Sequence, residues 1–103
     1  MVFIETSRFT ELIKTHLSDD EYAAFQWLLL ERPDAGSIVS GSGGVRKIRW
    51  GLRGRGKRGG IRVIYYWKKP DGEIWLLTLY PKNEKGTIPG HILKQIALEI
   101  DDE

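Results

Sequence analysis

The chain has 103 residues, 41% of them hydrophobic, and a formal net charge of +2 at pH 7, which together predict one globular domain spanning residues 1–103. It has no cysteine, which excludes disulfides and cysteine-built zinc sites, and its apolar runs, such as residues 27–30, are far too short to span a bilayer. Glu5 interrupts the apolar start of the chain, which is not typical of a secretion signal, so we expect a cytoplasmic protein that binds no membrane.

The first third of the chain predicts a strand followed by two helices. Residues 2–6 open with Val-Phe-Ile and have the composition of a short strand. Apolar side chains then recur at helical spacing through residues 9–17, which predicts a first helix. A capping-box pattern beginning at Ser18 starts a second helix, and Pro33 ends it. We expect the two helices to form a hairpin within residues 7–32.

The rest of the chain predicts strands and a closing helix. We expect extended segments at residues 38–39, 45–50, 61–67 and 74–80. Isoleucine recurs at every fourth position from Ile88 to Ile100, which predicts an amphipathic C-terminal helix. The order β-α-α-β-β-β-α indicates an α+β fold, in which a mostly antiparallel twisted sheet packs against the helical hairpin and the C-terminal helix.

Charge is segregated along the chain. No acid occurs between Asp34 and Asp71, while the rest of the chain holds six basic and fourteen acidic residues. The acid-free interval carries ten basic residues: Arg46, Lys47, Arg49, Arg53, Arg55, Lys57, Arg58, Arg62, Lys68 and Lys69. Such segregation creates a strong local field, whose commonest natural partner is nucleic acid. The alternative is a solvated basic face that binds no ligand.

The basic loop, residues 52–60, contains the pattern G-x-G-x-x-G at residues 54–59, and residues 51–57 match most of a phosphate-binding P-loop. A P-loop requires Ser or Thr where this chain has Arg58, and both motifs require a following helix where we predict a strand. We therefore expect no nucleotide cofactor. The loop instead suits contacts to RNA phosphates, because arginine offers paired donors and glycine allows close approach. The alternative is a flexible loop with solubilising charge.

Side chains alternate between the two faces of a strand, which groups the basic residues. Lys47 and Arg49 share one face of their strand, and Arg62 shares a face with Ile64 and Tyr66. On the last strand the same rule groups Leu76, Thr78, Tyr80 and, if the strand continues, Lys82. Aligned strands would form a cationic groove with a phenol that stacks a base or donates a proton. The alternative for Tyr80 is packing at the rim of the core.

Little in the chain suits conventional acid–base or metal chemistry. His16 and His91 fall on predicted helices outside the basic interval, so we expect them at the surface or at helix ends. No Ser-His-Asp arrangement and no cluster of metal ligands stands out. We expect neither a metal nor a cofactor.

Three segments together resemble the HigB branch of the RelE toxin superfamily. They are Arg46-Lys47-Ile48-Arg49, the run GKRGG-x-R-x-IYY at residues 56–66, and LLT-x-Y-x-KNE at residues 76–84. The likeness extends over nearly the whole chain, because the family has the same hairpin and closing helix. It implies a ribosome-dependent messenger RNA endoribonuclease, or mRNA interferase, which cleaves translated messenger RNA in the ribosomal A site. It also implies a cognate HigA-like antitoxin as partner.

The resemblance assigns roles to individual positions. The implied catalytic residues are Lys47, Arg49, Lys57, Arg62, Tyr80 and Lys82. The implied RNA-binding residues are Arg46, Arg53, Arg55, Arg58 and Lys68. Some relatives carry a second lysine at the position of Arg49, so the general base stays unassigned. The implied chemistry is attack of the ribose 2′-hydroxyl on the adjacent phosphate with release of a 5′-hydroxyl. Cations would stabilise the developing charge, and no metal is needed.

Two other readings stay open. A ParE-like toxin would inhibit DNA gyrase by binding it, without a cationic cleft for catalysis. A phage-derived RNA-binding module would have the basic surface without activity. A neighbouring gene for a small helix-turn-helix protein would favour the toxin–antitoxin reading.

Overall fold

A computed structural model describes residues 1–51, 60–84 and 88–102. The elements are β1 (Val2–Glu5), α1 (Ser7–His16), α2 (Asp19–Glu31), β2 (Ser37–Ile38), β3 (Arg46–Trp50), β4 (Ile61–Lys68), a 3-10 turn η2 (Lys69–Asp71), β5 (Glu73–Pro81) and α3 (Gly90–Asp101). The predicted element order and α+β class are confirmed, and the expected short extended segment is the two-residue strand β2. No helix in these ranges is long and apolar enough to cross a membrane.

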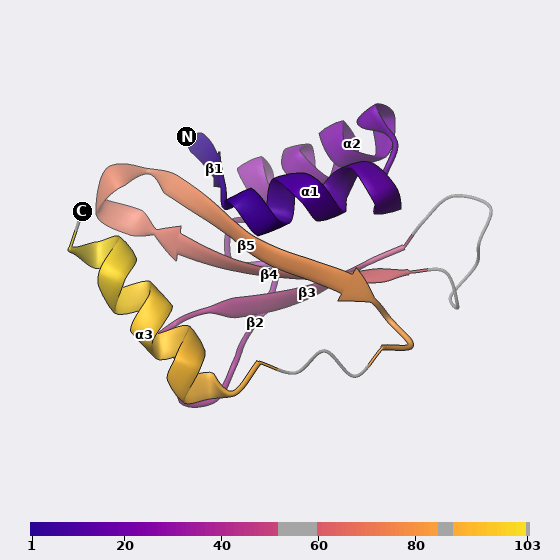
Figure 1. The fold of residues 1–103 in the computed structure, drawn as a ribbon. Helices are drawn as coiled ribbons and strands as arrows, with labels where there is room; N and C mark the ends of the chain where they lie inside the picture. The colour runs from indigo at the N-terminus through magenta and orange to yellow at the C-terminus, as the bar shows by residue number, and fades with distance from the viewer. Residues whose placement is uncertain (52–59, 85–87, 103) are drawn as a thin grey trace.

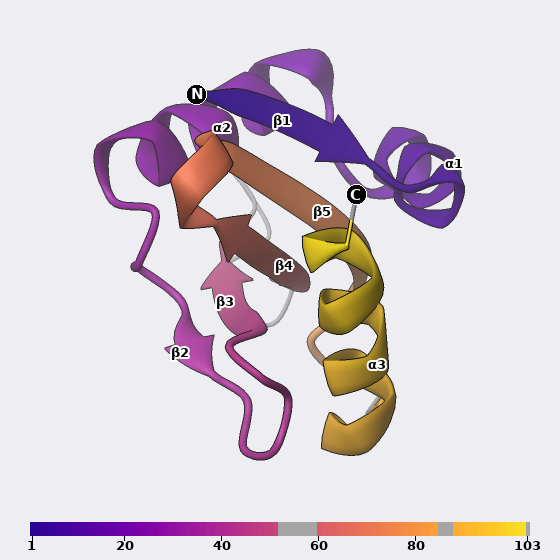
Figure 2. The same cartoon turned by 90° about the vertical axis from the view of Figure 1, so that its left-hand side faces the viewer.

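The strands form one sheet in the order β1-β5-β4-β3-β2 (Figure 1). β1 pairs with β5 in parallel, and the other three pairings are antiparallel, as expected for a mostly antiparallel sheet. β5 is an interior strand, which explains its nearly continuous apolar sequence, because both of its faces are covered. Figure 1 shows α1 and α2 above the sheet and α3 below it, and Figure 2 shows α2 and α3 on opposite sides of the sheet.

Each face of the sheet carries its own apolar core. The hairpin-side core joins the helical hairpin to the sheet through Phe9, Ile13, Leu17, Phe25, Leu29, Ile61, Val63, Tyr65, Ile74, Leu76 and Leu79. The α3-side core joins α3 to the sheet through Val45, Ile64, Leu77, Leu93, Ala97 and Ile100. The two sets define the faces to which the neighbouring polar side chains belong.

α2 begins where its capping box predicts. The Ser18 hydroxyl accepts a hydrogen bond from the Glu21 backbone N–H at 3.1 Å, and the Glu21 carboxylate accepts one from the Ser18 N–H at 2.9 Å. This reciprocal pair satisfies two donors that a helix start leaves without partners. α3 begins at Gly90, after Pro89, so Ile88 packs against the α3-side core from outside the helix. The predicted helix therefore began two residues too early.

A β-bulge corrects the expected alternation on β5. Tyr65 pairs with Leu76 while the preceding Ile64 pairs with Thr78, so Leu77 is an extra residue. Leu76 therefore faces the helical hairpin, and the prediction that it shares a face with Thr78 was wrong, because an inserted residue reverses the parity of everything beyond it. The Leu77 carbonyl accepts a hydrogen bond from the Thr6 hydroxyl at 2.7 Å, which ties the bulge to the start of α1.

Candidate active site

A row of two arginines and a tyrosine crosses the three inner strands. Arg49 on β3 is the register partner of Arg62 on β4, and Arg62 is the partner of Tyr80 on β5. Arg62 lies two residues from Ile64 of the α3-side core, so this row is on the face that carries α3. The predicted groove depended on an alignment of the three strands that alternation within each strand cannot give. The register of the structure brings Arg49, Arg62 and Tyr80 side by side.

The next row toward the interior of the sheet contains Lys47, Ile64 and Thr78. Lys47 lies two residues before Arg49, so both side chains belong to the same face, and the Lys47 side chain is half-buried while Arg49 is exposed. Thr78 is buried, with 6% exposure. Sequence reasoning grouped it with Tyr80 on one face by alternation alone, but assigned it no role.

Tyr80 and Lys82 lie where β5 ends. Tyr80 packs against the α3-side core and stays partly exposed, so rim packing and membership of the row both apply to it. The Lys82 backbone N–H donates to the Gly60 carbonyl at 2.9 Å, just beyond the last register pair of β4 and β5. This bond places Lys82 at the end of the sheet where β4 begins, next to the row.

The basic loop joins this same end of the sheet. Gly51 follows β3 directly and Gly60 precedes β4, so the loop departs from and returns to the two strands that carry Arg49 and Arg62. The predicted loop residues Arg53, Arg55, Lys57 and Arg58 lie outside the described residues. The structure places only the two ends of the loop beside the row.

Arg46 lies on the other face of the sheet. It is the register partner of Tyr65, a residue of the hairpin-side core. Its guanidinium donates to the backbone carbonyls of Gly36 at 2.7 Å and Asp34 at 3.2 Å. Arg46 therefore holds the segment after α2 against the sheet and does not join the row. Burial raises the pKa of the neighbouring Tyr65 hydroxyl, which donates to the Pro33 carbonyl at 2.8 Å.

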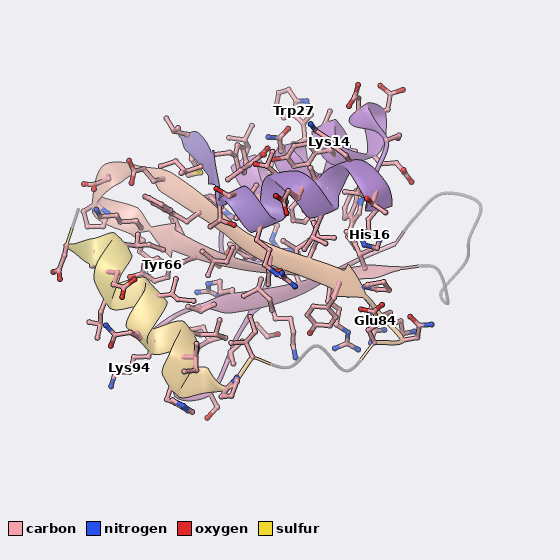
Figure 3. All side chains as sticks on the ribbon, in the orientation of Figure 1. Lys14, His16, Trp27, Tyr66, Glu84 and Lys94 are labelled. Atoms are coloured by element: carbon pink, nitrogen blue, oxygen red, sulfur yellow. The ribbon has the colours of Figure 1, made fainter. Side chains whose placement is uncertain are left out.

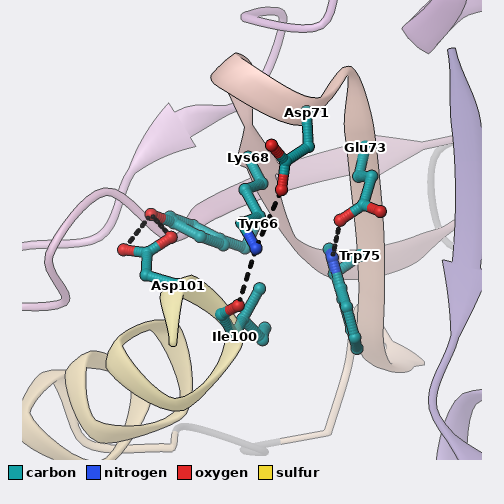
Figure 4. Close-up of polar contacts among 7 residues, drawn as sticks. All are labelled: Tyr66, Lys68, Asp71, Glu73, Trp75, Ile100 and Asp101. Carbon is teal, nitrogen blue, oxygen red and sulfur yellow. Dashed lines mark hydrogen bonds and ion pairs between the residues drawn. The ribbon is translucent and has the colours of Figure 1, made fainter. Parts of the chain in front are cut away.

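Lys68 is separated from the row by the length of β4. It is buried, with 8% exposure, and its ammonium donates to the Ile100 carbonyl at 3.0 Å and pairs with Asp71 at 2.9 Å (Figure 4). The hydrogen bond to the Asp71 carboxylate raises the pKa of Lys68. Tyr66 also holds α3, because its hydroxyl donates to both carboxylate oxygens of Asp101 at 2.9 Å. Lys68 is thus committed to attaching the C-terminal helix.

The described hollows of the surface lie away from the row. One, of about 260 Å³, is lined by Arg46, Trp67 and the C-terminal end of α3. Another, of about 510 Å³, lies between the start of α2 and Trp50. Neither is lined by a residue of the row, so shape does not mark the candidate site among the described residues. We place it from charge and register, which bear directly on chemistry.

The row can bind and stabilise anions, and Tyr80 is its one member that can exchange a proton. Arginine stays protonated in proteins, so Arg49 and Arg62 act through charge and hydrogen bonding only. Two guanidiniums on adjacent strands can contact two oxygens of one phosphate group. Tyr80, Lys47 and Lys82 are the nearby groups that can exchange a proton. Within the described ranges, no three His, Cys, Asp or Glu side chains are grouped as metal ligands would be.

No family model matches the chain. A search of solved structures finds the Escherichia coli toxin RelE, as an arginine-to-alanine double mutant in the free state. The match has a TM-score of 0.57 at 16% sequence identity, and it covers 80% of this chain and 83% of that one. The three helices, the sheet and their order are therefore those of the RelE toxin fold.

Proposed function

We propose that this chain is a HigB-like toxin, a cytoplasmic, metal-independent endoribonuclease that cleaves translated messenger RNA in the ribosomal A site. The observation that carries the proposal is the row Arg49–Arg62–Tyr80, which crosses three adjacent strands of a RelE-like fold. A likeness in fold does not by itself carry an activity. The row adds what the proposed chemistry requires, which is a concentration of donors for a phosphate.

In the proposed reaction the ribose 2′-hydroxyl attacks the neighbouring phosphorus. A bond to the 2′-oxygen forms, the bond to the 5′-oxygen breaks, and the 2′-proton passes to a base while the leaving oxygen gains a proton. Arg62 lies at the centre of the row and stabilises the negative charge that develops on the phosphoryl oxygens. Lys47, Lys57 and Lys82 are candidates for the base, because an amine can accept a proton once neutral whereas a guanidinium stays protonated.

Ribosome dependence follows from what the row lacks. It contains neither a carboxylate nor a histidine, the usual partners of acid–base catalysis. A site of this kind gains most from holding its substrate in the reactive geometry, which is worth several orders of magnitude in rate. The ribosome would supply that orientation to the messenger RNA.

The proposed RNA surface extends from the row along the basic loop. Arg53, Arg55, Lys57 and Arg58 belong to this surface in the proposal, because the ends of their loop lie beside the row. Arg46 and Lys68 are not carried forward, since their charged groups are bonded within the protein. A HigA-like antitoxin is the proposed neutralising partner, because an unrestrained nuclease of this kind would harm its host.

Primer extension on messenger RNA in a translating extract tests the proposal. We expect cuts inside reading frames with the wild-type protein, and few cuts in the same RNA without ribosomes. Arg62→Ala should abolish most cutting, whereas Arg8→Ala, which removes an exposed arginine from α1 on the opposite face, should not. Equal cutting of free RNA would refute ribosome dependence. Intact RNA together with stalled gyrase would favour the ParE-like alternative.

A further inference from the structure

The outer side of α2 carries an exposed apolar stripe. Trp27 is 65% exposed and Leu30 is 39% exposed, and Ala23 is exposed four residues before the tryptophan. The spacing i, i+4, i+7 places the three on one side of the helix. Figure 3 shows Trp27 on the outer side of the hairpin, across the sheet from Lys94 on α3. We call Ala23, Ala24, Trp27 and Leu30 the α2 stripe.

This stripe is not needed for the fold. α2 already packs on the sheet through Phe25 and Leu29, which are both fully buried on its inner side. The outer side of a hairpin helix in water normally carries charged or polar residues, and single exposed apolar residues need no explanation. Several along one side, with a tryptophan at the centre, mark a surface for contact with another molecule.

The charge around the stripe restricts what can bind it. α2 itself has no basic residue, and its exposed acids Asp19, Asp20 and Glu31 lie at the two ends of the stripe. The exposed Arg32 that follows the helix offsets only Glu31, so the surroundings stay acidic on balance. Acidic residues repel phosphate groups, which disfavours both nucleic acid and anionic lipid. Complementarity instead favours a protein surface whose apolar side chains are flanked by lysine or arginine. The same acids disfavour a symmetric contact between two copies of α2.

We propose that the α2 stripe is a docking site for an amphipathic helical segment of a partner protein, with basic residues at its flanks. A helix of that kind buries its apolar side against a complementary surface through side chains at i, i+3, i+4 and i+7. The small side chains of Ala23 and Ala24 allow its backbone to approach closely, and Trp27 supplies the largest apolar contact. The inference stands on α2 alone and is independent of whether Arg62 cleaves RNA.

The location gives the docking site a consequence. α2 lies on the opposite side of the sheet from α3, whereas the row Arg49–Arg62–Tyr80 is on the α3 face (Figure 2). A partner on the α2 stripe therefore leaves the row uncovered. The molecule would present two surfaces of opposite charge, one for an anion and one for a basic protein segment.

A designed peptide tests the proposal on the intact protein. The probe is an 18-residue helical peptide with leucines at i, i+3, i+4 and i+7 and lysines at both flanks. Its binding is measured by fluorescence anisotropy, and its position by mapping amide chemical shifts of the protein. We expect shifts confined to α2 and binding that weakens at least about tenfold in Trp27→Gln. Ala23→Arg, which adds a charge of the same sign as the peptide's lysines and a bulky side chain, should weaken binding at least as much. Leu98→Gln is the matched control, because Leu98 is 50% exposed on α3.

Four outcomes would overturn the proposal. The first two are absence of any peptide binding and shifts centred outside α2. The others are equal binding of the wild-type and Trp27→Gln proteins, and equal binding of a peptide whose lysines are replaced by glutamate. Messenger RNA cleavage separates this failure from that of the proposed function: Trp27→Gln should keep full cleavage, and Arg62→Ala should keep full peptide binding.

Discussion

Replacing Arg62 by methionine should separate activity from stability. Methionine keeps an unbranched apolar stem of similar length and removes the charge and all five N–H donors. Arg62 is the middle member of the row, with Arg49 on one side and Tyr80 on the other. The substitution therefore removes the charged group between Arg49 and Tyr80, while the apolar part of the side chain that packs on the sheet changes little in volume.

The loss of activity can be bounded from the position of the side chain. A unit charge about 4 Å from a phosphate oxygen is worth roughly 1 kcal/mol in water and roughly 4 kcal/mol at the effective dielectric of a protein surface. Arg62 is half-buried, so its environment lies between these limits. These limits correspond to rate losses of about 5-fold and about 1,000-fold. We expect single-turnover cleavage on the ribosome to fall at least about tenfold, because the charge on the phosphate develops in the transition state.

The thermal stability of the Arg62→Met protein, in contrast to its activity, should stay the same or increase. Arg49 and Arg62 are direct register partners in an antiparallel pair, whose Cα atoms are about 4.5–5.5 Å apart. Like charges placed directly opposite each other destabilise a sheet by roughly 0.2–1 kcal/mol. Removing one of them should leave Tm unchanged or raise it by up to about 4–8 °C for a chain of this size. A site that costs stability is expected where function sets the sequence.

Single-turnover cleavage with stalled ribosomes and thermal unfolding of the free protein measure the two effects. Arg8→Met serves as the control in both assays, because Arg8 is exposed on α1. Full cleavage by Arg62→Met would show that the row is not the active site. A Tm lowered by more than a few degrees would show that Arg62 stabilises the sheet, contrary to the like-charge argument.

Three further predictions concern the base, pH and backbone packing. Lys47→Arg or Lys82→Arg should cleave nearly as poorly as the alanine variant if that lysine is the base, and normally if it acts only through charge. Burial and the hydrogen bond to Asp101 raise the pKa of Tyr66 from 10.0 to about 12, so the folded state keeps the proton that the unfolded chain loses. Stability should therefore fall between pH 10 and 12 in denaturant titrations, and less steeply in Tyr66→Phe. Gly90→Ala should lower Tm despite better helix propensity, because its Cβ would clash with the Ser40 carbonyl.

Local signals in the sequence predicted most of the fold. The capping box at Ser18 and the break at Pro33 fix the limits of α2, because both depend on neighbouring residues only. The strands were found from alternating and β-branched residues, within one residue at each end. The start of α3 was placed too early, because Ile88 continues the apolar period although Pro89 and Gly90 begin the helix.

The row itself needed information that no single strand contains. Parity grouped Lys47 with Arg49 and left open which residues on β4 and β5 lie beside them. The alignment depends on the register of two strand pairings, and the second contains a bulge at Leu77. The bulge is bound by a tertiary contact, the hydrogen bond from the Thr6 hydroxyl to the Leu77 carbonyl, which joins residues 71 positions apart. Local sequence could not predict it.

Charge counting weighs every basic residue equally, so it does not separate residues that lie on different faces of the sheet. The acid-free interval indicated one basic surface, yet the strands that it spans have two faces and two ends. Arg46 falls on the hairpin face and Lys68 at the far end of β4, and each becomes a donor to backbone carbonyls. A buried charge is stable only with such partners, so burial had to be known before their role. Asp71, three residues after Lys68, was the one local hint of its ion pair. A cation in a basic run is therefore best assigned to ligand binding after its face and its burial are known.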